Sequence, residues 1–261
     1  MFLGQSIGVL MSCALLCAQP KVTIAPSPDP KVVIIPIDQS GSAEAEAMFS
    51  GQFASLASTS FFISNQTGQP IWAIYVRCIA KNSAGWSPTA FVMLDSFAHP
   101  NARPVLQPGS RILIIAPGKS IPENSLVHVS GTPLATILAQ GALGWFKNLS
   151  SITVDISIDS IIFGNGEVEG PDTENFIEEL PNRKLAADSV LAAINAGDSA
   201  QLSAMAAQTV KTDDGHFSQY QRLFANNYVQ SAASARDGFV KILQWLQPVP
   251  LLFRAPSAPA N

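Results

Sequence analysis

The sequence predicts an α+β protein, with an antiparallel β-sandwich over residues 56–170 and a small helical segment over residues 171–247. Two observations support this prediction. Residues 151–159 alternate apolar and polar side chains, and a period of two residues is typical of a half-buried strand. From residue 182 onward, apolar residues recur every three or four positions, which is the period of an amphipathic helix. The change of period places the boundary near Pro171.

Short apolar stretches separated by turn signals fill the chain before residue 151, and this pattern is typical of a β-sandwich. Residues 71–80 are apolar almost throughout, which predicts a central strand. Residues 31–37 are β-branched but contain Pro36, and a proline in a strand belongs at the edge of a sheet. Further strands are expected over residues 61–63, 89–97, 111–116 and 126–129, and a long crossing with a partial helix over residues 131–148.

The beginning of the chain predicts export. Residues 8–18 form an apolar run as long as the hydrophobic part of a signal peptide and too short to cross a bilayer. We therefore expect residues 1–18 to be a signal peptide and the mature protein to be secreted or periplasmic, with no transmembrane segment. A lipid anchor at Cys13 is the alternative, and Met11 fits it poorly. Residues 19–55 are expected to be a proline-rich linker with one edge strand, of which residues 19–30 form an extended spacer without a core.

Three helices are expected in the second part of the chain, over residues 183–195, 199–211 and 217–247. The last of these is long and amphipathic, with a possible bend at Asp237 and Gly238, where glycine weakens a helix. Its apolar stripe has three possible partners: the other two helices, the sandwich or another chain. Residues 248–261 are expected to be a disordered tail.

Composition excludes some functions. Charged residues make up 13% of the chain, so much of the polar surface must come from uncharged side chains, as is common on exported proteins. A net charge of −4 provides no basic surface for nucleic acid. Of the three cysteines, Cys13 and Cys17 lie in the predicted signal peptide, so the mature chain has no internal disulfide. Cys78 is expected to be a small buried residue in a strand.

The sequence contains no nucleophile elbow, phosphate loop or dinucleotide fingerprint, so we predict no catalytic residue, no cofactor and no metal. His99, His128 and His216 are far apart along the chain. Asp213 and Asp214 precede His216, and they fit a helix-capping turn better than a calcium loop, because a distal glutamate is absent.

The carboxylates of residues 151–172 are also interpreted as structural. Asp155 and Asp159 lie on one face of the predicted strand but ~13 Å apart, beyond the reach of an acid–base pair. We therefore expect a solvated outer face, where changing either residue to asparagine has little effect. Glu167, Glu169 and Asp172 are expected in a solvated loop after the glycine turn.

Three stretches resemble bacterial immunoglobulin-like modules of the cell-adhesion-related and fibronectin type III kinds: FFISNQTGQPIWAIYV, LQPGSRILI and VDISIDSIIFGNGEVEG. The resemblance covers roughly residues 56–170 and implies an antiparallel immunoglobulin-like β-sandwich. Such modules share no active site, so the resemblance implies no functional residue. Cys78 has no partner, which excludes antibody-type domains.

These observations predict an exported, non-enzymatic binding or structural protein of the bacterial envelope, whose partner is an unknown protein or glycan. An alternative is a carbohydrate-active accessory or hydrolytic protein that binds a glycan through sandwich loops. Trp86 and Trp145 would then be the ligand-binding residues, because aromatic rings in loops stack on sugars, although both could instead cap the core. A third hypothesis is self-assembly through the C-terminal helices.

Overall fold

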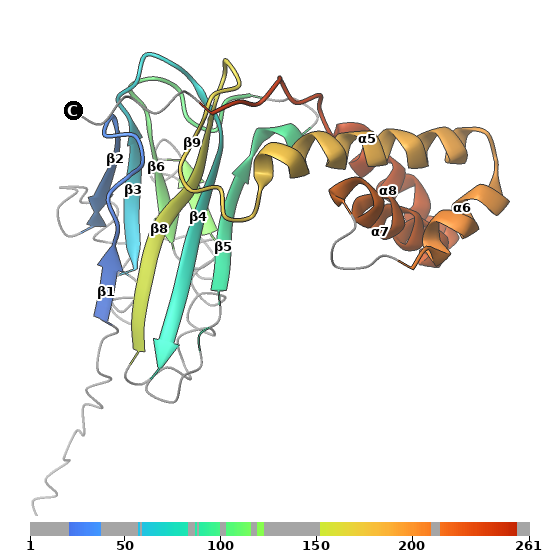
Figure 1. The fold of residues 1–261 in the computed structure, drawn as a ribbon, viewed down its shortest axis with the longest axis horizontal. Coiled ribbons are helices and arrows are strands. Elements are labelled where there is room, and N and C mark those ends of the chain that lie inside the picture. The colour runs from blue at the N-terminus through green and yellow to red at the C-terminus, as the bar shows by residue number, and fades with distance from the viewer. Residues whose placement is uncertain are drawn as a thin grey trace, which may run out of the picture.

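A computed structural model provides the structure of the protein and describes residues 21–37, 57, 59–82, 87, 89–99, 103–115, 119–122, 152–209 and 215–254 (Figure 1). Two sheets of mostly antiparallel strands lie beside a group of helices, which confirms the predicted α+β class. Several predictions fall outside the described residues: the signal peptide with Cys13, the strand over residues 126–129, the crossing over residues 131–148, and the positions His128, Asp213 and Asp214.

The first sheet, sheet A, contains the stretch that alternates most clearly in sequence. Its strands lie in the order β1 (Lys21–Ile24), β8 (Ile152–Phe163), β4 (Ile71–Asn82) and β5 (Thr89–Asp95), and the short β9 (Val168–Glu169) also pairs with β8. β1 is parallel to β8, and the other pairs are antiparallel. β4 lies between β8 and β5, so the predicted central strand is confirmed.

The second sheet, sheet B, contains β2 (Val32–Pro36), β3 (Ser60–Asn65), β6 (Arg111–Ile115) and β7 (Lys119–Pro122), in that order and antiparallel. β2 is at the edge of this sheet, as Pro36 predicts. The spacer predicted over residues 19–30 is partly wrong, because residues 21–24 form β1. Val22 and Ile24 of this strand alternate with polar residues, and both pack against the core between the sheets.

The two sheets share one hydrophobic core. Its buried side chains come from the inner faces of both sheets and include Phe61, Ile63, Ile112 and Ile114 from sheet B, and Ile74, Val76, Cys78, Val154, Ile156 and Ile158 from sheet A. Cys78 is a free, fully buried thiol in β4, as the sequence predicts. Its burial raises the pKa of the thiol to about 12.

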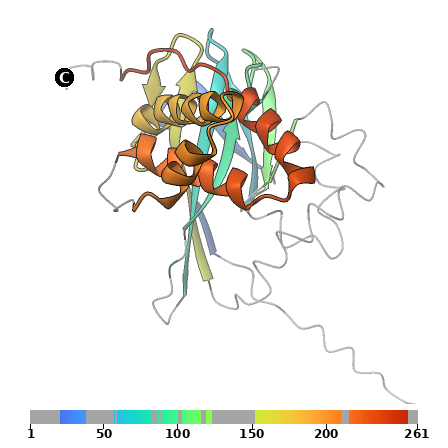
Figure 2. The same cartoon turned by 90° about the vertical axis from the view of Figure 1, so that its right-hand side faces the viewer.

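The helices form a small bundle of their own beside β5 (Figures 1 and 2). After a short 3₁₀ turn, η3 (Ser96–Ala98), the described helices are α5 (Phe176–Asn195), α6 (Ser199–Ala207), α7 (His216–Gln230) and α8 (Ala233–Trp245). They share a second core, which includes Ala187, Val190, Leu202, Met205, Ala225 and Leu243. α5 starts earlier than the predicted residue 183, because Phe176 and Leu180 bury its first turns against sheet A, and Pro181 is accommodated inside the helix.

The prediction of one long helix over residues 217–247 is wrong. The chain breaks at Ser231 and Ala232 instead of at Gly238, which lies inside α8. Ser231 has an extended backbone, and its hydroxyl donates a 2.6 Å hydrogen bond to the carbonyl of Asn227. The main-chain N–H of Ser231 donates to the same carbonyl, at 3.1 Å, so the hydroxyl is a second donor there and competes with the helical pattern at the end of α7.

The predicted disordered tail is also wrong for its first part. Residues 247–254, which we call the C-terminal strap, return from α8 to sheet A. Leu252 of the strap is buried with Ile162, Val168 and Phe176 in a third cluster on the outer face of sheet A. Residues 255–261 lie outside the described part of the chain.

Candidate functional site

The structure tests only some of the residues singled out in the sequence. Trp86 and Trp145 lie outside the described residues, so their role in ligand binding stays a prediction. Asp155 lies on the outer face of sheet A, as expected, and forms a 2.7 Å ion pair with Lys81. Both side chains are about half exposed, so this pair contributes little to stability.

The prediction of a solvated outer face is wrong for Asp159, which is only 1% exposed. The cause is a bulge in β8. Tyr75 pairs with Ser160, and the next residue, Val76, pairs with Ile158. Asp159 is therefore an extra residue in β8 that has no pairing partner in β4. Beyond the bulge, the outer face of β8 is covered by the start of α5 and by the strap.

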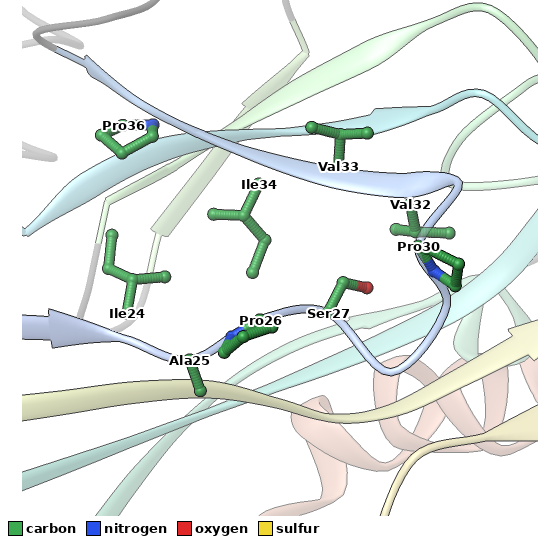
Figure 3. A pocket seen from close by; sticks show the side chains of 9 residues that line it. All are labelled: Ile24, Ala25, Pro26, Ser27, Pro30, Val32, Val33, Ile34 and Pro36. Atoms are coloured by element: carbon green, nitrogen blue, oxygen red, sulfur yellow. The ribbon is translucent and has the colours of Figure 1, made fainter.

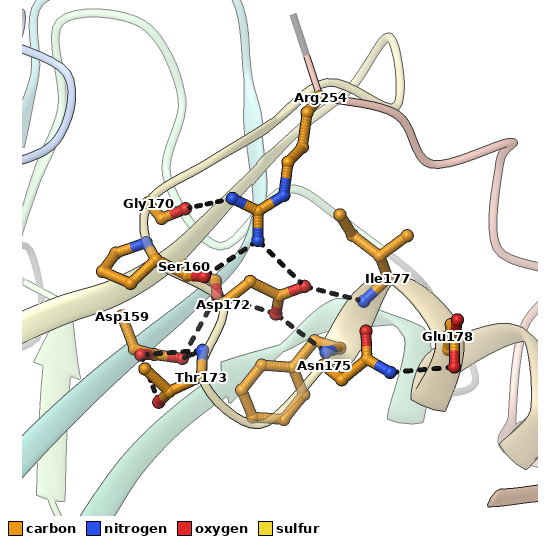
Figure 4. Close-up of polar contacts among 11 residues, drawn as sticks. Asp159, Ser160, Gly170, Asp172, Thr173, Asn175, Ile177, Glu178 and Arg254 are labelled. Atoms are coloured by element: carbon orange, nitrogen blue, oxygen red, sulfur yellow. Dashed lines mark hydrogen bonds and ion pairs between the residues drawn. The ribbon is translucent and has the colours of Figure 1, made fainter. Parts of the chain in front are cut away.

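The carboxylate of Asp159 is held by hydrogen bonds from the chain itself (Figure 4). It accepts one from the main-chain N–H of Thr173, at 3.1 Å, and one from the hydroxyl of Thr173, at 2.6 Å. The hydroxyl of the next residue, Ser160, lies 3.1 Å from a carboxylate oxygen of Asp172 and donates to it. Burying a carboxylate is costly unless it accepts hydrogen bonds, and these donors supply them.

Asp172 also contradicts its prediction, since its side chain is buried and not solvated. It accepts hydrogen bonds from the main-chain N–H groups of Phe176, at 2.8 Å, and Ile177, at 3.3 Å. These N–H groups have no partner within α5, so the carboxylate caps the helix. Its negative charge also interacts favourably with the positive N-terminal end of the helix dipole.

Arg254, at the end of the strap, completes this cluster (Figure 4). Its guanidinium lies 3.7 Å from the carboxylate of Asp172 and donates to the carbonyls of Gly170, at 3.0 Å, and Pro171, at 2.8 Å. We call Asp159, Ser160, Asp172, Thr173 and Arg254 the anchor network. It joins three elements at one point: the bulge of β8, the start of α5 and the strap.

Two glycines make room for this arrangement. Gly166 has a φ of +91°, and a Cβ atom there would overlap the carbonyl oxygen of Leu251 in the strap. Gly170 has a φ of +111°, and a Cβ atom there would overlap the carbonyl oxygen of Asp159. The glycine turn predicted from the sequence therefore also serves close packing against the strap and the bulge.

A second polar cluster fixes α5 to β5. Arg183 forms a 2.5 Å ion pair with Asp95, and both side chains are largely buried. Burial opposes the charge on Arg183, but Asp95 holds its pKa above the usual value. Nearby, the hydroxyl of Tyr220 donates to Glu179, while the Tyr75 ring stacks on Phe176. Burial is the main cause that raises the pKa of both tyrosines.

The opposite side of the sheets carries a groove of about 390 Å³ between β1 and β2 (Figure 3). It lies where the two sheets meet at their open edges, and the chain from β1 to β2 closes one end. Its lining is almost entirely apolar and consists of Ile24, Ala25, Pro26, Ser27, Pro30, Val32, Val33, Ile34 and Pro36. The hydroxyl of Ser27 is buried there without a hydrogen-bond partner in the described structure.

Beside the groove, no strand in the described part of the chain pairs with the outer edge of β2, which we call its open edge. The N–H of Gln66 donates to the carbonyl of Lys31, so in the alternating pattern of an antiparallel pair Lys31, Val33 and Ile35 face β3. The backbone groups of Ile34 and Pro36 therefore face away from β3. Proline has no N–H, and an N–H at position 36 would point away from β3. Pro36 therefore removes no hydrogen bond from the β2–β3 pair.

Sequence reasoning missed both the groove and the anchor network. Pro36 marked the open edge of β2, but the groove depends on β1 pairing with β8, which the proline-rich composition of residues 19–30 obscured. The three glycines at positions 164, 166 and 170 were the available signal of close backbone approach near the anchor network.

In the described ranges, no group of three or more histidine, cysteine, aspartate or glutamate side chains is arranged to bind a metal ion. None of the helices in this part of the chain combines the length and the apolar character needed to cross a membrane. Comparisons of the chain with protein families, with curated proteins and with solved structures find no match.

Proposed function

We propose that the protein is an exported, non-enzymatic binding or structural protein of the bacterial envelope, and that it binds an extended polypeptide segment at the groove between β1 and β2. The observation that carries this proposal is the combination of an apolar groove with an open backbone edge beside it. An apolar groove takes the side chains of a ligand, and an open strand edge takes its backbone.

The chemistry of the groove favours a polypeptide over a sugar. The N–H and C=O of Ile34 lie on the open edge, and an added strand supplies the matching carbonyl and N–H. The apolar lining then accepts alternate side chains of that strand. A sugar ring requires several polar partners, and the lining of this groove provides few.

The strand arrangement supports an immunoglobulin-like module. β4 and β5 form one hairpin and β6 and β7 another, while the chain crosses between the sheets from β3 to β4 and from β5 to β6. Connections of this kind belong to Greek-key sandwiches, the group that includes immunoglobulin-like modules.

The anchor network supports a structural and not a catalytic role for the buried carboxylates. Asp159 and Asp172 direct their oxygens at main-chain N–H groups and hydroxyls of neighbouring residues. Export is supported by the apolar run over residues 8–18 and by the low charged fraction of 13%.

Binding can be tested on the full chain by fluorescence anisotropy with labelled hexapeptides that alternate threonine with valine, isoleucine, leucine or phenylalanine. We expect at least one peptide of this panel to bind, and its version N-methylated at every second residue to lose most of its affinity. Equal binding of both versions, or no binding by the whole panel at millimolar concentration, contradicts strand addition.

A matched pair of variants tests the edge directly. Ile34→Pro removes the outward N–H and leaves the ladder to β3 intact, so we expect a loss of affinity of about tenfold or more, as for one lost hydrogen bond in a desolvated site. Ile34→Val keeps the N–H and is expected to bind almost as the unaltered chain does. The glycan hypothesis with Trp86 and Trp145, and self-assembly through the helices, stay predictions.

A further inference from the structure

In the described structure, the hydrogen bonds that attach the C-terminal strap to the rest of the molecule lie near its two ends. The N–H of Gln247 donates to the carbonyl of Phe97, at 2.7 Å. Near the other end, Phe253 exchanges hydrogen bonds with the β8–β9 turn: its N–H donates to Gly166, at 3.0 Å, and its carbonyl accepts from Val168, at 2.8 Å. Of the strap side chains, Leu252 is buried, whereas Leu251 is 87% exposed. Segments with so little buried apolar surface open more readily than the core.

The strap forms one wall of a second cleft, of about 360 Å³. Sheet A and its connections supply Trp72, Phe97 and Gly164, while the strap supplies Pro248, Val249 and Pro250. The rings of Trp72 and Phe97 stack with their centres 5.7 Å apart. The position of the strap therefore determines whether this pair of aromatic rings is enclosed or accessible.

Arg254 holds the end of the strap, and its loss leaves the rest of the anchor network with partners. Asp172 keeps the hydrogen bonds from Ser160, Phe176 and Ile177, and Asp159 keeps those from Thr173. The start of α5 thus has its own attachment to β8. Release of the strap is separable from release of the helices.

We propose that the strap is a releasable latch, fastened by Arg254, which detaches from sheet A as a unit while the sheets and the helical bundle stay folded. Its detachment opens the cleft at Trp72 and Phe97. This inference does not depend on the peptide-binding groove, which is lined by other residues.

Native-state hydrogen exchange of the full chain tests this latch. The amides of Val168 and Phe253 report on the strap, and the amide of Val76 in β4 reports on the core. We expect Val168 and Phe253 to exchange at least a hundredfold faster than Val76, with a weaker dependence on denaturant. If all three amides exchange at one rate with one denaturant slope, the strap opens only when the whole protein unfolds, and the proposal fails.

Two variants test whether Arg254 holds the strap in place. Arg254→Ala is expected to speed exchange at Val168 and Phe253 by about tenfold, the size expected for lost charge-assisted hydrogen bonds, and to leave Val76 unchanged. Arg222→Ala removes an exposed arginine of α7 and serves as the control. Equal acceleration of strap and core amides by Arg254→Ala shows a general loss of stability and contradicts the role of Arg254 as a latch.

Discussion

The main-chain N–H of Asp172 donates a 3.0 Å hydrogen bond to the carbonyl of Asp159, and this bond ties the entry of α5 to the bulge of β8. The side chains of both aspartates are buried beside it. The stretch between them turns the chain from the sheets to the helices. Its conformation is fixed by contacts with Thr173, Arg254 and the strap, which all lie later in the chain.

Asp159→Asn should lower the free energy of unfolding by about 1–3 kcal/mol, because one of the two acceptors for Thr173 is replaced by a donor in a buried site. Asp155→Asn on the same strand is the control, and its exposed pair with Lys81 predicts a change of less than about 1 kcal/mol. Urea unfolding of both variants measures the difference. Equal effects would mean that the bulge does not bury Asp159.

Gly166→Ala should destabilise the protein more than Gly109→Ala does. Both glycines have a positive φ, +91° and +76°, so both substitutions strain the backbone. Only at position 166 does the new Cβ also overlap the strap, whereas nothing lies within 4 Å at position 109. Thermal unfolding compares the two, and hydrogen exchange at Phe253 should rise in Gly166→Ala alone. The packing of the strap against the turn is refuted if the two variants behave alike.

Arg183→Ala should cost about 3–5 kcal/mol, since it leaves the buried carboxylate of Asp95 without its cation. Lys184→Ala at the neighbouring position is the control. The pair of Lys184 with Asp188 is more exposed and of the i,i+4 type, so its loss should cost about 0.5 kcal/mol. Urea unfolding measures both costs. A small effect of Arg183→Ala would show that the helical bundle is held on sheet A by apolar contacts alone.

The Cys78 thiol should resist modification in the folded protein. Burial raises its pKa from 9.0 to about 12, so between those pH values the unfolded chain loses the proton and the folded chain keeps it. Through Cys78, stability therefore falls as the pH rises across this window. In a Cys13→Ser, Cys17→Ser background, a thiol reagent at pH 8 should react only after urea is added. Rapid reaction without urea contradicts the burial of Cys78.

Local patterns in the sequence were enough to predict the α+β class and several strands, but not β1 or β7. The alternation at residues 151–159 marks β8, the apolar run at residues 71–80 marks the central β4, and Pro36 marks an edge. Each of these signals arises within a few residues, because strand period and proline chemistry are local properties.

The rest depends on partners that are distant in sequence. The bulge at Asp159 exists only in the pairing of β8 with β4, and nothing in residues 151–159 alone reveals a change of register. The strap looked like a tail because its burial depends on the outer face of sheet A. Continuous apolar periodicity concealed the break at Ser231, where a hydroxyl bonds to the preceding turn and competes with the helix.

If a peptide adds as a strand at the groove, the main-chain amide of Ile34 should become protected. In the free protein this N–H faces away from β3, so it should exchange faster with solvent than the N–H of Ile35, which faces β3. Hydrogen exchange followed by NMR, with and without a saturating peptide from the binding panel, should show protection gained at Ile34 and little change at Ile35. If Ile34 gains no protection in the complex, the peptide does not add to the edge of β2, and the proposed function is contradicted.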